Sequence, residues 1–305
     1  MPIRTKLVLL IIALALLGSV TLRDETRLIQ ELENAAHAPV FGIASLILLS
    51  TLKGDQKRRY LLAWTGAVIL GAALEGLQAV EGRDAEALDV LRDGAGAASF
   101  LLAYWSLQDG SATRALRWSL RALAAGVLVL VFAPPALTGM AIATRYMRFP
   151  LIEDFESRWT RRLCSAGAVR LDVVQAPGGF GMPGENRVAR ITFEPAEYSG
   201  WAISGPFPDW SGRRELAFEV YSELSEPVPM TLRIHDRWHN QEYGDRYNRE
   251  FVIQPGVNKI RVPVGQVEST PAGRRMDLAA IDGIGLFVVR PERSFVLYFD
   301  GFRLE

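Results

Sequence analysis

The sequence predicts two fold classes in one chain, an α-helical membrane bundle of about five transmembrane helices followed by an all-β sandwich. Two observations predict this division. The long apolar runs that carry no charge all lie before about residue 145. From Phe149 onward, short segments alternate apolar and polar residues and are separated by Gly, Pro, Asn and Asp. We therefore expect a transmembrane domain over 1–145 and a water-soluble domain over 146–305.

The composition of the 305 residues excludes several classes of protein. Lys and Arg number 34, as do Asp and Glu, so the chain lacks the excess positive charge that holds a nucleic-acid backbone. A hydrophobic share of 49% is too high for intrinsic disorder. The single cysteine, Cys164, excludes an intrachain disulfide and any zinc site built on several cysteines. We expect no nucleic-acid partner.

Five apolar runs are candidates for helices that cross the membrane. They are 7–20, 39–52, 61–80, 88–107 and 118–143. A helix needs roughly 20 apolar residues to span the hydrocarbon core, so the first two runs must include flanking residues. The first run follows Arg4 and Lys6, as in a signal peptide, but no convincing small-residue cleavage site follows it. We expect this run to remain as an anchor.

The basic residues of the connections predict the orientation of the chain. Lys and Arg precede the first run, recur four times within 53–59 and precede the fifth run, whereas the alternate connections, 23–38 and 81–87, are more acidic. Basic residues mark the cytoplasmic side of a membrane protein. With an odd number of spans, the N-terminus is expected in the cytoplasm and the C-terminal domain in the periplasm or outside the cell.

Polar residues interrupt two of the apolar runs at helical spacing. The set is Glu75, Gln78, Asp89 and Asp93, with Arg83 in the turn between the two runs. An ionisable side chain at membrane depth is costly unless it faces protein or water. Two interpretations stay open. One is a buried ion-pair cluster that fixes the helical hairpin; the other is a catalytic pocket in which Arg83 binds phosphate or carboxylate and an acid accepts a proton.

His37, which precedes the second run, is a further candidate for the same cluster. It could shuttle protons to Glu75 and Asp89, or it could be a residue at a helix start that bonds to nearby backbone. The sequence has no HExxH motif and no second histidine near His37. Nothing in the spacing of these residues therefore supports a catalytic zinc site.

The helical residues resemble the VanZ-like membrane family over about 30–107. The residues that carry the resemblance are His37, Glu75, Gln78, Arg83, Asp89 and Gly96. Asp93 is a departure, because the family commonly has asparagine at that position and the aspartate adds a possible negative charge. The resemblance implies a protein of the bacterial inner membrane and cell envelope, in a family linked to glycopeptide (teicoplanin) tolerance whose reaction is not settled.

The second half has the texture of an antiparallel sandwich. Alternating or β-rich segments occur at 216–221, 232–235, 249–253, 258–264, 283–289 and 294–299. Turn residues lie between them, at 177–179, 183–184 and 255–258. A pattern with a period of two over such a length predicts two packed sheets.

One stretch of the second half is rich in residues suited to sugars. A sugar ring presents C–H patches and hydroxyls, so its site needs flat aromatic rings and planar polar groups. The candidates are Trp210, Arg233, His235, Trp238, Tyr243 and Arg246. The alternative interpretation is that the two tryptophans fill the core or cover an edge and that the charged residues form a solvated loop.

The two ends of this half and the segment 208–212, PDWSG, resemble carbohydrate-binding modules of the galactose-binding-like jelly-roll group, most nearly family 11. The matching ends are 153–156, EDFE, and 298–304, YFDGFRL. The resemblance implies a jelly roll whose first and last strands lie side by side. It also implies a possible structural calcium ion, for which Asp154, Glu156 and Asp300 are the candidate ligands. This half contains no GxSxG elbow and no phosphate loop.

The leading hypothesis is a membrane protein of the bacterial envelope that binds a polysaccharide or lipid-linked glycan through its sandwich. Tethering such a domain beside the membrane raises its effective concentration near exported glycans. One rival is a membrane enzyme that acts on polyprenyl-phosphate-linked or lipid-linked sugar at Glu75, Arg83, Asp89 and His37. A second rival is a protein-docking module of an export or assembly complex. The sequence leaves open whether any reaction is catalysed.

Overall fold

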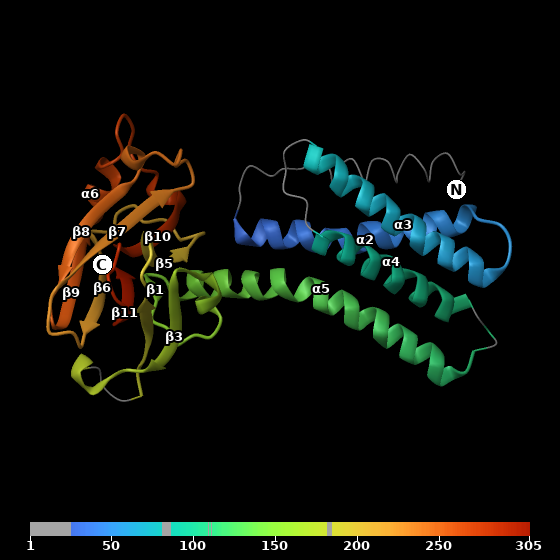
Figure 1. The fold of residues 1–305 in the computed structure, drawn as a ribbon, viewed down its shortest axis with the longest axis horizontal. Coiled ribbons are helices and arrows are strands. Elements are labelled where there is room, and N and C mark those ends of the chain that lie inside the picture. Colours follow the sequence, from blue (N-terminus) through green and yellow to red (C-terminus); the bar gives the residue numbers. More distant parts are fainter. Residues whose placement is uncertain (1–25, 81–86, 109, 111, 182–184) are drawn as a thin grey trace. The chain divides into compact units, whose positions relative to one another are not determined.

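The computed structural model describes residues 26–80, 87–108, 110, 112–181 and 185–305 (Figure 1). The chain divides into two compact units, Met1–Ala136 and Leu137–Glu305. The division falls inside helix α5 (Arg114–Arg148), so the last turns of this helix belong to the second unit. The sequence places the boundary between 145 and 146, close to the C-terminal end of the same helix.

The first unit consists of long helices. They are α2 (Arg27–Thr51), α3 (Gln56–Val80), α4 (Ala87–Gln108) and most of α5. Proline occurs inside two of them, Pro39 in α2 and the pair Pro134 and Pro135 in α5. The proline pair does not end the fifth helix, since α5 continues through it to Arg148.

Three of the described helices are long and apolar enough to cross a membrane, namely α2, α3 and α5. The predicted run 88–107 does form a helix, α4, but α4 is not among the three. Asp89, Arg92 and Asp93 all lie in its N-terminal half, where they lower its apolar character. The predicted run 7–20 lies outside the described residues. The expected count of about five transmembrane helices is therefore not confirmed.

Small residues bring the helices of the first unit close together. A Cβ atom on Gly96 of α4 would lie 2.2 Å from the backbone oxygen of Ala38 in α2. A Cβ atom on Gly71 of α3 would lie 2.1 Å from Oδ2 of Asp93. Both approaches are possible only because glycine has no side chain. Gly96 and Gly71 thus let polar residues of α2 and α4 reach one another.

The second unit is a sandwich of two antiparallel sheets. The first sheet has the order β3 (Val169–Gln175), β4 (Arg187–Phe193), β11 (Phe295–Leu304), β6 (Glu215–Ser222) and β9 (Gly256–Pro263), with β1 (Leu151–Glu153) paired to β11. The second sheet has the order β2 (Cys164–Gly167), β5 (Tyr198–Ser204), β10 (Ile281–Val289), β7 (Val228–Asp236) and β8 (Tyr247–Ile253). A short helix, α6 (Val264–Ser269), follows β9. The pairing of β1 with β11 places the first and last strands side by side, as expected.

The core lies between the two sheets. Leu216, Phe218 and Val220 of β6 and Leu232 and Ile234 of β7 all belong to it. The predicted alternation along these two strands is confirmed, since apolar residues on one face of a strand recur every second position. Stacked and edge-to-face aromatic rings fill the centre, including Trp201, Phe218, Phe299 and Phe302.

The last turns of α5 are built into the sandwich unit. Arg145 is fully buried, and its Nη1 atom donates a hydrogen bond of 2.6 Å to the backbone oxygen of Ser204. The Arg145 guanidinium also lies 4.5 Å from the centre of the Phe207 ring. Tyr146 donates a hydrogen bond to the backbone oxygen of Phe207. A buried guanidinium needs such partners to offset lost hydration, so these contacts fix the helix end against the end of β5.

Candidate functional site

The helices of the first unit enclose a cluster of ionisable side chains. Nδ1 of His37 in α2 lies 2.8 Å from Oδ1 of Asp93 in α4, and both side chains are buried. Glu75 of α3 and Asp89 of α4 complete the cluster: ligand atoms of His37, Glu75 and Asp89 all lie within 4.8 Å of one another. The candidate residues His37, Glu75, Asp89 and Asp93 thus meet in one place, because three helices each contribute to it.

The other residues of the expected cluster, Gln78 and Arg83, differ in whether the structure describes them. Gln78 is buried on the same side of α3 as Glu75. Arg83 lies outside the described residues. Arg92, which the sequence analysis missed, forms an ion pair with Asp89. Its signal was the spacing of three positions from Asp89, which puts both residues on one helix face.

The same cluster contains the group of residues best placed to hold a metal ion. Within the described ranges, His37, Glu75 and Asp89 are the one set of three or more His, Cys, Asp or Glu side chains whose ligand atoms converge. Imidazole and carboxylate ligands suit several divalent transition metals. Asp93 would orient the imidazole through its other nitrogen, as carboxylates beside metal-bound histidines do. In the described structure His37 bonds to Asp93, and Arg92 pairs with Asp89. The sequence analysis grouped these three residues as candidates for proton transfer, but it did not predict that their ligand atoms converge, because they come from three helices.

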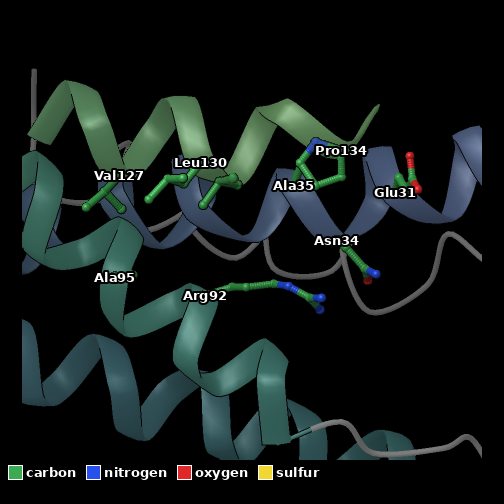
Figure 2. A pocket seen from close by; sticks show the side chains of 9 residues that line it. Glu31, Asn34, Ala35, Arg92, Ala95, Val127, Leu130 and Pro134 are labelled. Carbon is green, nitrogen blue, oxygen red and sulfur yellow. The ribbon is translucent and has the colours of Figure 1, made fainter. Parts of the chain in front are cut away.

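A cavity of about 470 Å³ lies near this cluster (Figure 2). Figure 2 shows Arg92 of α4 extending toward Asn34 of α2, with Val127, Leu130 and Pro134 of α5 forming an apolar wall. Neither Glu75 nor Asp89 lines the cavity, whereas Arg92, the partner of Asp89, does. The cavity therefore combines the polar side chains of Arg92, Glu31 and Asn34 with apolar walls.

A second group of polar side chains lies on the outer face of the second sheet. Ile234 of β7 points into the core, so its neighbours Arg233 and His235 point outward. Across from His235 on β10 stands Gly283, where a Cβ atom would lie 2.2 Å from Cε1 of His235. Glycine at this position lets the imidazole lie across β10. Together with Arg246, these two residues form what we call the basic face (Arg233, His235 and Arg246).

Arg246 joins the basic face from the neighbouring strand. Ile234 pairs with Tyr247 of β8, and continuing that register places Arg246 opposite His235. The Arg246 guanidinium lies 5.3 Å from the centre of the Tyr243 ring. Burial, together with the positive charge of Arg246, lowers the pKa of Arg233. Two guanidinium groups are therefore close enough to repel each other.

His235 is electrically neutral at physiological pH. Burial and, next, the charge of Arg233 lower its pKa to about 4. The His239 ring lies 5.3 Å from the His235 ring. A neutral imidazole offers one donor and one acceptor nitrogen, which suits hydroxyl groups. His235 therefore adds hydrogen-bonding capacity to the basic face without adding charge.

The aspartates of this region already have an arginine partner. Arg274 donates hydrogen bonds of 2.6 and 2.8 Å to the two carboxylate oxygens of Asp236, and it also pairs with Asp245. This contact with Arg274 is the main cause that lowers the pKa of Asp245 to about 2. Both carboxylates are thus paired with Arg274, and they frame the β7–β8 connection (237–246).

Two aromatic rings of this connection are open to solvent. The Trp238 side chain is 61% exposed, and its Nε1 atom donates a hydrogen bond of 3.2 Å to Oδ2 of Asp277. Tyr243 is 70% exposed. Trp210, in contrast, has an exposed fraction of 0% and packs edge-to-face against Phe207. The expectation that Trp210 contacts a sugar is therefore corrected: it fills the core, which was the alternative interpretation.

The three candidate calcium ligands lie near one another at the paired ends of the sandwich. Burial is the main cause that raises the pKa of Asp300 to about 6, and the charges of Asp154 and Glu156 add to the effect. Asp154 forms an ion pair with Arg148, and Glu156 accepts a hydrogen bond from the backbone nitrogen of Arg187. The carboxylates of this set do not converge as those of the helical cluster do. Arg148 supplies positive charge here, and calcium stays a prediction.

The chain matches no family model and no curated protein. The VanZ resemblance of the helices therefore stays an expectation. About half of the chain is similar to solved structures. An exo-β-agarase shares 19% identity over 51% of this chain and 24% of its own length, with a TM-score of 0.41. The chain thus spans about a quarter of that enzyme.

Carbohydrate-binding modules are also similar to this chain. The family 11 module from Clostridium thermocellum, in complex with a β-1,3-1,4-mixed-linked tetrasaccharide, shares 16% identity over 50% of this chain and 93% of its own length, with a TM-score of 0.38. TmCBM61, in complex with β-1,4-galactotriose, shares 17% identity over 47% of this chain and 86% of its own, with a TM-score of 0.30. We carry no ligand or residue role from these structures to this chain.

Proposed function

We propose that the sandwich binds a glycan through the β7–β8 connection and the basic face beside it. The observation that carries this proposal is the pairing of two exposed rings, Trp238 and Tyr243, with the polar side chains of Arg233, His235 and Arg246. Flat rings can stack on the C–H face of a sugar while planar donors bind its hydroxyls. Exposed aromatic rings also lose little conformational entropy on binding.

The helical unit suggests where the sandwich would bind its glycan. Three helices can cross a membrane. We propose that they anchor the sandwich on the outer side of a bacterial cytoplasmic membrane, within reach of polysaccharides or lipid-linked glycans. Tethering makes weak binding sufficient, because the ligand and the domain share a thin layer of space. In this function the sandwich recruits or senses glycan and catalyses nothing.

A glycan array probed with the full-length protein in detergent micelles tests the proposal. We expect Trp238→Ala and Tyr243→Ala each to weaken binding about tenfold, since a central aromatic contact typically contributes at least that much. Tyr198→Ala is the matched control. Tyr198 is similarly exposed, but it pairs with Val289 of β10, whereas His235 pairs with Gly283. Those positions are roughly 20 Å apart along the strand.

The control should bind as tightly as the wild type. Equal affinity of the wild type and both variants would contradict the proposed surface. Failure of the wild type to bind any glycan, together with capture of an envelope protein, would favour the docking alternative.

A second candidate function rests on the helical cluster. His37, Glu75 and Asp89 converge near a cavity that combines Arg92, Glu31 and Asn34 with apolar walls, features that suit a lipid with a polar head group. This arrangement favours an enzyme that acts on polyprenyl-phosphate-linked or lipid-linked sugar. Glu75→Gln and Asp89→Asn would then abolish the cellular phenotype while the protein remains folded in the membrane. Loss of the folded protein would indicate a purely structural cluster.

A further inference from the structure

We infer that the basic face selects glycans that carry negative charge, such as those built from uronic acids. This inference rests on the proposed function, because it assigns a ligand class to the same surface. The shared chemistry is an anionic oxygen pair on a sugar ring, which a guanidinium group binds with two parallel hydrogen bonds.

The two arginines of the basic face have no anionic partner among the described residues. Arg233 and Arg246 are both half-buried and repel each other. Among the residues that the structure describes, neither guanidinium forms an ion pair or a hydrogen bond, and the Nε atom of each is buried without a partner. Holding two like charges together and partly out of water costs free energy. An anionic group bound between them would recover that cost, whereas a neutral hydroxyl would recover much less.

The aspartates near the basic face already have other partners. Asp236 and Asp245 are bonded to Arg274, and Asp277 accepts hydrogen bonds from Trp238 and from the backbone of Ala279. These carboxylates are therefore not partners for the basic face. Arg274 keeps them compensated and leaves the positive charge of the two arginines available to a ligand.

Two exposed acids remain to be considered, Glu250 on β8 and Glu242 in the connection. Glu250 lies on the outer face opposite Thr231, one pair along from Arg233. Within the described part of the chain Glu250 forms no ion pair with either arginine, and it is exposed. Both glutamates are exposed, so they are well solvated and offset little of the charge of the two half-buried guanidinium groups.

Tyr243 and His235 lie beside the two arginines and can contact the same sugar. The Tyr243 ring lies directly beneath the Arg246 guanidinium. A sugar that contacts the exposed part of the Tyr243 ring therefore lies close to Arg246. His235, whose Nδ1 atom is buried without a partner, lies on the same face, two positions along β7 from Arg233 and opposite Arg246, and can bond to a hydroxyl. The surface thus offers an aromatic platform, a neutral hydrogen-bonding group and two cations.

Calorimetric titration of the full-length protein in a neutral detergent tests the inference with three probes. The first is an oligogalacturonide, the second is the same oligosaccharide with its carboxylates converted to methyl esters, and the third is a sulfated oligosaccharide. We expect the oligogalacturonide to bind at least tenfold more tightly than its methyl ester, and we expect salt to remove most of the difference. Comparable binding of the sulfated probe would show that the shared anion chemistry suffices. Weaker binding of that probe would show selection for carboxylate.

Arg233→Gln and Arg246→Gln should each weaken binding of the oligogalacturonide far more than binding of its methyl ester, and so remove most of the preference for charge. Arg293→Gln is the matched control, because Arg293 is exposed and pairs with Glu226 away from this face. Lysine variants at 233 and 246 should restore part of the preference, and unfolding temperatures check that each variant is folded. Equal affinity for the oligogalacturonide and its methyl ester would overturn the inference and leave glycan binding intact. Failure to bind all three probes and the glycan array would overturn both.

Discussion

Arg274 and Asp236 form a two-pronged ion pair at the base of the β7–β8 connection, with N–O distances of 2.6 and 2.8 Å. Asp236 is fully buried, and it also accepts a hydrogen bond of 2.7 Å from the backbone nitrogen of Asp277. Asp277 in turn orients Trp238. A single buried carboxylate therefore links Arg274 to the exposed tryptophan, although the residues lie far apart in the sequence.

Arg274→Met should destabilise the sandwich by about 3 kcal/mol or more, because it leaves the buried Asp236 charge without its partner. The buried Trp201 and Trp210 rings report the transition through their fluorescence. Arg275→Gln, which changes an exposed neighbour paired with Glu268, is the control and should shift stability by less than about 0.5 kcal/mol. Identical unfolding curves for both variants would show that the ion pair contributes nothing to stability.

Asp300 should make the sandwich less stable as the pH rises. Burial raises its pKa from 3.8 to about 6 in the folded chain. Between about pH 4 and 6 the unfolded chain loses the proton while the folded chain keeps it, so stability falls across this window and the full cost applies above pH 6. That cost is roughly 3 kcal/mol.

Asp300→Asn removes this cost. The variant should match the wild type near pH 4 and exceed its stability by about 2 to 3 kcal/mol at pH 7.5, measured by denaturant unfolding. Glu226→Gln changes an exposed acid and serves as the control. A pH profile that is the same in the wild type and the Asp300 variant would contradict the buried, protonated state.

Calcium should raise the unfolding temperature of the wild type at pH 7.5. A divalent cation would compensate the neighbouring carboxylates of Asp154, Glu156 and Asp300. Burial raises the pKa of Asp300, and the negative charges of Asp154 and Glu156 raise it further. The increase should disappear on chelation, in Asp300→Asn, and when magnesium replaces calcium. No change with calcium would leave Arg148 as the cation of this site and overturn the metal prediction.

Gly96→Ala should destabilise the helical unit, because the added Cβ would overlap the backbone of Ala38 and push α2 from α4. Gly76→Ala in α3 is the matched control. A Cβ atom there meets nothing within 4 Å, so the change should be neutral or stabilise the helix by up to about 1 kcal/mol. The yield of monodisperse protein in detergent and its unfolding temperature measure both effects. Equal behaviour of the two variants would show that the close approach is not required.

Protease treatment tests the proposed orientation. Added to intact spheroplasts, a protease should remove the sandwich and leave the helices in the membrane, because the charge distribution of the connections predicts a cytoplasmic N-terminus. In inverted vesicles the sandwich should be protected. The reverse pattern would place the domain in the cytoplasm and would contradict a role in binding exported glycan.

The sequence alone determined where helices end and strands begin. Continuous apolar runs predicted α2 to α5, and the alternation of Leu216, Phe218 and Val220 predicted an inward face of β6. These signals are local, because hydropathy within a window of residues reports how a segment must be buried. The sequence did not determine the number of membrane spans. Polar residues at the start of α4 lower its mean hydropathy, so composition alone does not decide whether α4 crosses the membrane.

The tertiary structure decided which side chains meet and which are exposed. Trp210 and Trp238 look alike in sequence, yet one fills the core and the other lies open to solvent. His37, Glu75 and Asp89 converge only because glycines let three helices approach, and Arg274 reaches Asp236 only because separate parts of the sandwich fold together. Contacts of this kind join residues far apart in the chain. No local pattern encodes them, because they depend on how complete elements pack.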